Sequence, residues 1–211
     1  MEVCFNMVEP FDPTSLEGRD PLECGEVGRE ISKIAEYTIE CLYCGNPSFR
    51  VEEYVYEIPV FGRILLSVGS CSLCGFKRRD VGVLEEKGPK KLVLRVRGER
   101  ELRYLLVKSA RAAVLVPEVA LEYTPTLYSY GYITTVEGIL YEFQQAALVA
   151  CSGEQSQQCR DILAWLEKAV DGEIEFTVII CDYDGLSKIV GEGVIEVGLD
   201  EECRALTGYS T

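Results

Sequence analysis

Four cysteines in two Cys-x-x-Cys-Gly motifs are the residues of this chain best suited to chemistry. Cys41 and Cys44 form the first pair and Cys71 and Cys74 the second, with 26 residues between Cys44 and Cys71. Two such pairs at this separation are typical of a zinc site, because Zn²⁺ takes four ligands and each tight turn supplies two thiolates. The glycine after each pair suits a positive φ, which turns backbone N–H groups toward the sulfurs.

The absence of histidine decides what kind of metal site we expect. The chain of 211 residues has none, which excludes nitrogen ligands from the site. The four-ligand set is therefore Cys41, Cys44, Cys71 and Cys74. A closed four-thiolate site has no open coordination position, so the predicted zinc is structural rather than catalytic.

The other reactive side chains give little support for an enzyme. Without histidine, general acid–base catalysis would need paired carboxylates or a tuned cysteine, and Asp182 and Asp184 share only a turn. The phosphate-loop pattern Gly-x4-Gly-Lys-Ser/Thr is absent, and Gly191-Glu-Gly193 lacks the third glycine of a dinucleotide-binding loop. We expect no catalytic activity.

The six remaining cysteines bear on the compartment and on disulfides. The sequence shows no secretion signal and no apolar run long enough for a membrane span, so we expect a reducing, cytoplasmic setting. Buried free thiols are the simplest interpretation, and disulfides of the kind found inside hyperthermophiles are the alternative. A disulfide between Cys151 and Cys159, on either side of one predicted turn, is geometrically feasible. The six are Cys4, Cys24, Cys151, Cys159, Cys181 and Cys203.

The acidic net charge is unevenly distributed along the chain. The total is −14, of which residues 111–211 carry −12 and residues 1–40 carry −7, whereas residues 81–110 carry +4. Most of this surface would repel a nucleic acid, and attraction is expected only near residues 77–108. A basic patch on a protein partner matches the acidic parts better, although acidity also serves solubility alone.

The residues around the cysteine motifs predict a small zinc ribbon. Residues 31–39 form a strand or a short helix, and periodicity does not decide which. Residues 50–58 and 60–67 are rich in Val, Tyr, Ile and Leu and predict two strands joined by a turn, with a cysteine pair at each end. Such a hairpin is too small to be held by burial, so the metal contributes its folding free energy, on the order of 10 kcal/mol.

The rest of the chain predicts a mainly β body with a helical insertion. Short strands are expected at 91–97, 102–108, 112–116, 119–123 and 130–135, in a sandwich or barrel-like arrangement. A helical hairpin follows at about 138–170, its second helix opened by a capping box at residues 152–155. Strands at 173–181 and 189–197 are then joined as a hairpin by an Asp-Gly turn.

These elements predict four regions along the chain. Residues 1–33 form an acidic arm, residues 34–80 the zinc ribbon, residues 81–198 the β-sandwich-like domain, and residues 199–211 a marginally ordered tail. Acidic side chains, three prolines and scattered glycines set the arm apart from the folded regions.

The order of these parts resembles the ZPR-type zinc-finger family, in its short archaeal form with one module. The resemblance rests on the two cysteine motifs, a basic strand, Lys108-Ser109, Pro117-Glu118, the string Thr134-Thr-Val-Glu-Gly138, a helical hairpin and an Asp-x-x-Gly-x-Ser turn. It covers about residues 34–197. The last turn departs from the family pattern, and only Asp182, Gly185 and Ser187 carry over.

The resemblance implies a fold, a cofactor and a partner. The fold is mainly β (α+β), a four-Cys zinc ribbon followed by a double-stranded β-helix-like sandwich with an inserted helical hairpin. The implied cofactor is Zn²⁺, and the implied function is binding of translation elongation factor 1 alpha, whose folding the eukaryotic relatives assist. Candidate partner contacts are Lys77, Arg78, Arg79, Thr134, Thr135, Glu137, Asp182, Gly185 and Ser187.

The alternative function is nucleic-acid binding in transcription or translation, through the ribbon. Residues 77–108 supply the positive charge, and Phe61 or Phe76 could stack on bases. Each candidate contact also has a purely structural interpretation: a solvated basic strand, threonines packed in a strand, or a glutamate in an internal ion pair.

Overall fold

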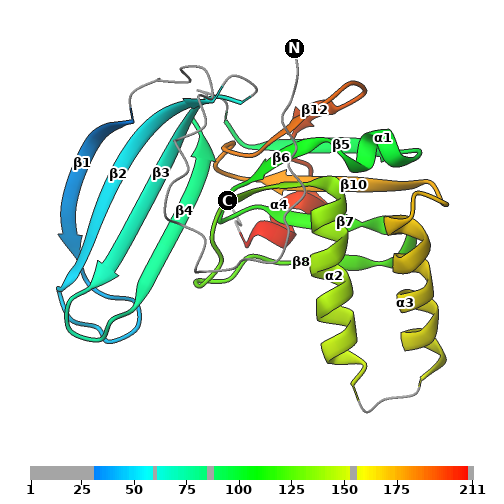
Figure 1. Cartoon of the computed structure of the whole chain (residues 1–211), viewed down its shortest axis with the longest axis horizontal. Helices are drawn as coiled ribbons and strands as arrows, with labels where there is room; N and C mark the ends of the chain where they lie inside the picture. The colour runs from blue at the N-terminus through cyan, green and yellow to red at the C-terminus, as the bar shows by residue number, and fades with distance from the viewer. Residues whose placement is uncertain (1–30, 59–60, 85–87, 153–155, 209–211) are drawn as a thin grey trace, which may run out of the picture.

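The computed structural model describes residues 31–58, 61–84, 88–152 and 156–208. Residues 1–30 of the predicted arm, including Cys4 and Cys24, therefore lie outside the described residues. Figure 1 shows a curved four-stranded sheet beside a larger body of β-strands and helices. The fold is mainly β, with the helical hairpin inserted in the body, as the sequence predicts.

The zinc-ribbon region is a four-stranded antiparallel sheet, wider than the predicted hairpin. Its strands are β1 (Ser32–Ile39), β2 (Phe49–Ile58), β3 (Gly62–Cys71) and β4 (Lys77–Val83), in that order. Residues 31–39, left undecided by periodicity, thus form an edge strand paired with β2. β4 runs to Val83, past the expected boundary at residue 80.

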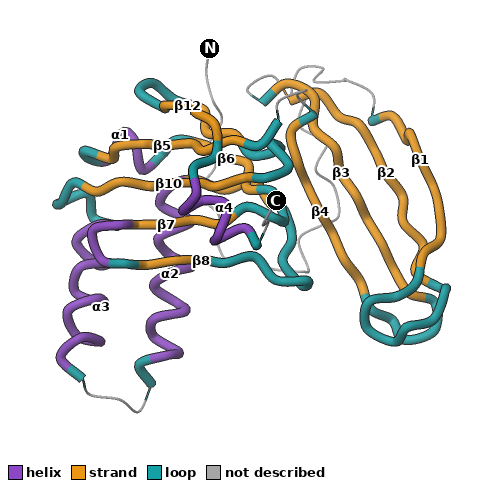
Figure 2. Tube along the Cα trace, turned by 180° about the vertical axis from the view of Figure 1, so that it is seen from behind, coloured by secondary structure: helices purple, strands orange, loops and turns teal. Residues whose placement is uncertain are grey.

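The body contains a five-stranded sheet and a three-stranded sheet. The larger has the order β12-β5-β10-β7-β8 and the smaller β11-β6-β9, with antiparallel pairing throughout. Figure 2 shows the strands of the larger sheet, and β6 of the smaller one, from the other side. Their strands are β5 (Lys90–Val96), β6 (Leu105–Lys108), β7 (Ala113–Val116), β8 (Leu121–Tyr123), β9 (Tyr132–Thr135), β10 (Phe176–Asp182), β11 (Lys188–Val190) and β12 (Ile195–Gly198).

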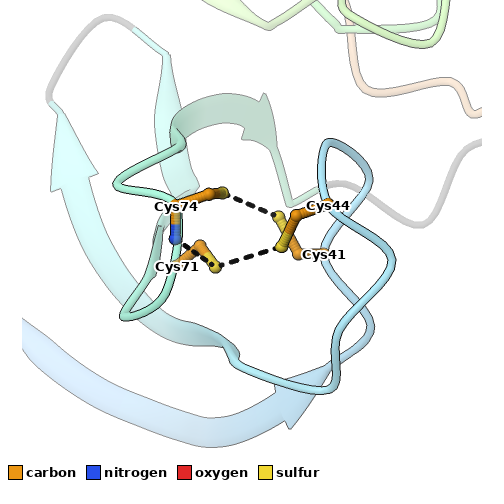
Figure 3. Close-up of side chains that lie close together, drawn as sticks. All are labelled: Cys41, Cys44, Cys71 and Cys74. Atoms are coloured by element: carbon orange, nitrogen blue, oxygen red, sulfur yellow. Dashed lines mark hydrogen bonds between the residues drawn. The ribbon is translucent and has the colours of Figure 1, made fainter.

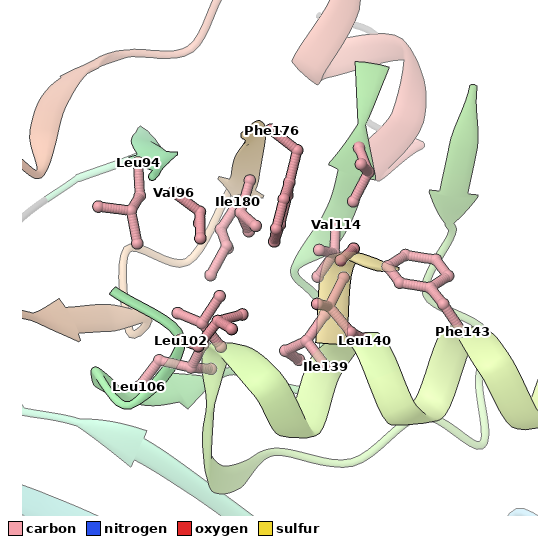
Figure 4. Close-up of a cluster of buried hydrophobic side chains, with 14 of the residues drawn as sticks. Leu94, Val96, Leu102, Leu106, Val114, Ile139, Leu140, Phe143, Phe176 and Ile180 are labelled. Atoms are coloured by element: carbon pink, nitrogen blue, oxygen red, sulfur yellow. The ribbon is translucent and has the colours of Figure 1, made fainter. Parts of the chain in front are cut away.

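The main hydrophobic core lies between these strands and the helical hairpin. Leu92, Leu94 and Val96 alternate along β5 and point inward, as their period of two predicts. Helix α2 (Val136–Ala150) contributes Ile139, Leu140 and Phe143, and helix α3 (Gln157–Val170) contributes Leu166. Figure 4 shows Ile139, Leu140 and Phe143 of α2 beside Val114 of β7 and Ile180 of β10. The hairpin is therefore part of the core at its base.

The tip of the helical hairpin corrects one prediction. The N-cap of α3 is Ser156, whose Oγ accepts a hydrogen bond from the Cys159 N–H, and not Ser152. Ser152 instead donates its hydroxyl to the Val149 carbonyl at the end of α2. A disulfide of 1.99 Å between Cys151 and Cys159 closes the turn.

The last part of the chain also differs from its prediction. The expected hairpin of 173–181 with 189–197 does not form, because β10 and β11 belong to different sheets and β12 pairs with β5. The expected tail contains helix α4 (Glu201–Thr207), joined to β10 by a disulfide between Cys181 and Cys203.

Two short helical turns lie between successive strands of the body. Helix α1 (Glu99–Leu102) precedes β6 and replaces the start of the strand expected at 102–108. The 3-10 turn η1 (Pro117–Val119) separates β7 from β8, where proline fixes the first position of the turn.

The four-stranded sheet is joined to the body by a second hydrophobic cluster. Phe61, Ile64, Val81 and Val83 of the sheet pack with Val107 of β6, and all five are buried. No helix among the described residues has the length and apolar character needed to cross a membrane.

Candidate metal centre and adjoining surfaces

The two cysteine motifs form a pair of equivalent turns at one end of the four-stranded sheet. In the first, the Gly45 N–H donates to the Cys41 carbonyl at 2.8 Å, and in the second the Gly75 N–H donates to the Cys71 carbonyl at 3.1 Å. Both glycines have positive φ, +69° and +74°. Positive φ favours glycine because it has no Cβ, so these glycines follow from the turn geometry.

The four sulfur atoms come together in one cluster. The distances Cys41 Sγ–Cys74 Sγ and Cys44 Sγ–Cys71 Sγ are both 3.7 Å, and all four atoms lie within 4.8 Å of one another. Figure 3 shows the side chains converging from the two turns. With Zn–S bonds of about 2.3 Å, the edge of a regular tetrahedron is about 3.8 Å. The cluster therefore has the spacing of a four-thiolate metal centre.

Hydrogen bonds around the cluster favour the thiolate form at two positions. Ser48 Oγ lies 3.1 Å from Cys71 Sγ, and with the Cys74 N–H it lowers the pKa of Cys71 to about 6. The backbone at Asn46 lowers the pKa of Cys44. The Phe76 N–H lowers the pKa of Cys74, but burial and the neighbouring thiols outweigh it and raise that pKa to about 12. Four thiolates this close together need a cation to offset their mutual repulsion.

A small hydrophobic cluster packs against the two cysteine turns. Phe49 and Val51 of β2 are buried against Cys41 and Cys71, with Phe76 packed alongside. The ring of Phe49 crosses β3 so closely that a Cβ on Gly69 would lie 2.3 Å from it. This close approach explains the glycine in the middle of a strand.

The outer faces of the turns carry apolar side chains that sequence reasoning missed. Leu42 and Leu73 are 51% and 68% exposed, and Tyr43 is 70% exposed although its ring stacks on Phe76. They occupy the variable positions inside the Cys-x-x-Cys motifs. The motif could have indicated their exposure, because the two residues between paired cysteine ligands are not ligands themselves.

The three predicted basic contacts on β4 have different roles. Lys77 and Arg79 are exposed. Arg78 instead donates to the carbonyls of Leu127 and Ser129, at 2.9 and 3.0 Å, and ties β4 to the body. The three residues line a cleft of 530 Å³ together with Phe76, Tyr128 and Tyr130.

The Thr134-Thr-Val-Glu-Gly138 string has a local structural explanation. Thr135 is the N-cap of α2, and its Oγ1 accepts a hydrogen bond from the Gly138 N–H at 3.0 Å. A Cβ on Gly138 would lie 2.1 Å from Thr134 Oγ1. Glu137 is half-buried in the first turn of the helix, where a negative charge is favourable.

The Asp182–Ser187 turn is an internal connection between the two sheets. The Asp182 carboxylate accepts the backbone N–H groups of Asp184 and Ser187, and Ser187 Oγ accepts the Ser109 N–H. Asp182 and Ser187 have no exposed surface, and Gly185 is buried at φ +71°. These burials correct the expectation of direct partner contact by these three residues, since a partner would instead meet Tyr183 and Asp184.

Lys108 is a buried cation that was not singled out as a site residue. Its side chain has no exposed surface, and Nζ donates to the Ser109 carbonyl at 3.1 Å. Nζ also lies 4.3 Å from the centre of the Tyr123 ring and 5.5 Å from that of Tyr132. Burial lowers the pKa of Lys108 to about 8, against the opposing effect of Glu142 and other carboxylates.

Comparison with known proteins agrees with these features. Residues 100–196 match the family model described as the ZPR1 jelly-roll domain. An uncharacterised ZPR1-like protein of Methanocaldococcus jannaschii is 34% identical over 169 residues, covering 78% of this chain and 85% of that protein. A second, from Pyrococcus horikoshii, is 28% identical over 198 residues, covering 87% and 89%.

Relatives from eukaryotes are longer. The zinc finger chaperone zpr1 of Schizosaccharomyces pombe is 28% identical over 169 residues, which are 76% of this chain and 36% of that protein. Human zinc finger protein ZPR1 is 26% identical, with 37% of its length covered. With its four-cysteine cluster, jelly-roll domain and helical hairpin, the chain belongs to the ZPR1 zinc-finger family.

Proposed function

We propose that this chain is a zinc-stabilised protein-interaction module that binds translation elongation factor 1 alpha or assists its folding. Cys41, Cys44, Cys71 and Cys74 hold the Zn²⁺, whose role is structural. The spacing of the sulfurs supports the metal, and the word chaperone in the name of the S. pombe relative supports the role. A partner in translation would place this activity in the cytoplasm.

The observation that carries the proposal is the apolar tip of the metal-binding turns. Leu42, Tyr43 and Leu73 are large, exposed and held on two short turns whose geometry the metal would fix. Large apolar side chains presented together on a rigid support are typical of protein-binding surfaces. Fixing the turns in advance also lowers the entropy cost of binding.

Metal content is the first test of the proposal. The purified chain should contain one zinc ion per molecule by elemental analysis, and Cys71→Ser should lower zinc retention because three thiolates leave an incomplete site. Ser70→Ala, one residue earlier on β3, is the control and should keep the metal. A wild-type chain that retains no zinc when purified with zinc present would remove the basis of the proposal.

Partner capture is the second test. We expect the zinc-loaded chain to capture elongation factor 1 alpha from the same organism and to raise the yield of active factor after dilution from denaturant. The triple change Leu42→Ala, Tyr43→Ala and Leu73→Ala should weaken capture at least tenfold. A double change of Leu148 and Val149 to alanine is the control, since both are exposed but lie on α2. Equal loss in both variants would contradict the assignment to the tip.

A specific observation favours nucleic-acid binding as the second candidate function. The cleft beside β4 combines the basic residues Lys77 and Arg79 with the exposed rings of Tyr128 and Tyr130, which is the combination that binds single strands. Phe61, by contrast, is 2% exposed and packs in the core, so it cannot stack on a base. In an electrophoretic mobility assay, binding of single-stranded RNA that weakens steeply with salt would support this candidate. Unchanged mobility of the RNA at low salt would reject it.

A further inference from the structure

A cavity of 260 Å³ lies between β8 and α2, on the body and apart from the metal centre. Three aromatic rings line it, those of Tyr123, Tyr132 and Phe143, and Ile139 contributes to its apolar wall. Two carboxylates, Glu122 and Glu142, line it as well. We call this site the aromatic cavity.

The combination of rings and carboxylates has a specific binding chemistry. The face of an aromatic ring attracts cations, and a cage of rings is the usual receptor for an ammonium or a quaternary ammonium group. A carboxylate adds direct charge attraction. The apolar wall contacts the methylene groups of a cationic side chain, as surface stems do elsewhere in proteins.

The same rings already pack against a cation from the interior. Lys108 Nζ lies 4.3 Å from the centre of the Tyr123 ring and 5.5 Å from that of Tyr132, and Lys108 is not among the residues that line the cavity. Its charge is offset by Asp182, Glu142 and Asp80. Burial disfavours the charge of Lys108, and these three carboxylates oppose that effect, so they limit the positive charge that a second cation would meet.

The carboxylates are placed for contact with a second cation. Glu122 and Glu142 are both exposed, and the Tyr132 hydroxyl donates to Glu142 Oε2 at 2.5 Å, which fixes that carboxylate beside the ring. Residues 111–211 carry a net charge of −12, so the surrounding field also attracts cations. The volume is below that of a drug-sized pocket, which suits a single side chain.

We propose that the aromatic cavity receives an alkylammonium side chain, lysine or a methylated lysine, presented by a partner protein. Aromatic faces and Ile139 enclose the alkyl stem and the ammonium head, and Glu122 and Glu142 neutralise the charge. The site adds a second point of contact to the proposed interaction module, but it rests on the cavity alone and needs neither zinc nor the elongation factor.

Three ligands of equal chain length test the proposal. They are the Nα-acetyl amides of lysine, trimethyllysine and norleucine, and norleucine lacks only the charged head. Binding to the whole zinc-loaded chain is followed by NMR shifts of amides in β8, β9 and α2. We expect at least one of the two cations to bind about 3- to 30-fold more tightly than norleucine. Equal or tighter binding of norleucine would overturn the proposal.

Variants connect the binding to these residues. Glu122→Gln and Glu142→Gln should each weaken binding of the better cation about threefold or more. Tyr123→Leu should also weaken it, because the ring is lost and only a smaller apolar side chain remains. Glu167→Gln, an exposed carboxylate on α3, is the matched control and should bind as the wild type does. Zinc content and thermal unfolding show whether each variant is folded. The site would be rejected if the control variant lost binding or if the cavity variants bound as tightly as the wild type. Either outcome is independent of the result of elongation-factor capture.

Discussion

Removing the metal should unfold one end of the four-stranded sheet and leave the body intact. The sheet has two separate hydrophobic clusters. At the metal end, Phe49 and Val51 pack against the cysteines. At the other end, Ile64 and Val83 pack with Val107 of the body. We therefore expect chelation, or Cys71→Ser, to act on the first cluster only.

The expected magnitudes indicate why the metal end should depend on zinc. Burying Phe49 and Val51 contributes about 1.5–3 kcal/mol each, hence about 3–6 kcal/mol together. A structural zinc contributes on the order of 10 kcal/mol or more. A bound zinc would thus stabilise this end more than apolar burial does, and we expect that burial alone would not replace it. The body end keeps its buried contacts with β6 and needs no metal.

Hydrogen exchange with mass spectrometry measures the two ends separately. After chelation, amides of residues 41–51 and 69–76 should exchange at least tenfold faster, whereas those of β10 should keep their protection. Leu73→Ser, in the same turn but not at a ligand position, is the matched control and should keep its zinc and its protection. If β10 lost protection together with the metal end, the sheet and the body would form one cooperative unit, and this reasoning would be refuted.

Three further outcomes are expected. Replacing Cys181 and Cys203 by alanine opens a loop with a sequence separation of 22 and should cost about 3 kcal/mol in chemical denaturation, whereas no change in midpoint would mean that the crosslink is not formed in solution. Burial lowers the pKa of Lys108 from 10.5 to about 8, so between pH 8 and 10 the unfolded chain binds more protons than the folded chain. The free energy of unfolding should therefore rise by about 2–3 kcal/mol over that interval. This rise should vanish in Lys108→Met, and an unchanged dependence of stability on pH in that variant would contradict the reasoning. Gly138→Ala should lower the free energy of unfolding by about 1–3 kcal/mol, because its Cβ would lie 2.1 Å from the Thr134 hydroxyl. Gly88→Ala is the control and should unfold like the wild type, because nothing lies within 4 Å of a Cβ at that position.

The sequence by itself determined the composition and order of the module. Two Cys-x-x-Cys-Gly motifs in a chain without histidine specify four thiolates, because no other ligand type with that spacing is present. Alternation along residues 91–97 identified an inward face, since side chains of a strand point to opposite sides. The helical period of the residues that follow Gly138 indicated the hairpin.

Strand pairing was decided only by the tertiary structure. The Asp182–Ser187 turn has the composition of a hairpin turn, yet the Asp182 carboxylate binds the turn internally and the chain continues into another sheet. The edge strand β1 forms because β2 offers a free edge, which local periodicity in residues 31–39 does not encode. Pairing partners far apart in the chain lie outside any local pattern.

The same limit applies to the candidate sites. Spacing along the chain identified the four cysteines of the cluster, because each pair lies within one turn and the sheet brings the two turns together. Ser187 is held by a hydrogen bond to Ser109, which lies 78 positions earlier in the chain. Arg78 ties β4 to the body through Ser129, which lies 51 positions later. The aromatic cavity likewise draws its rings from β8, β9 and α2. A site made by one turn is visible in sequence, whereas a site made by packing of distant elements appears only once they are packed.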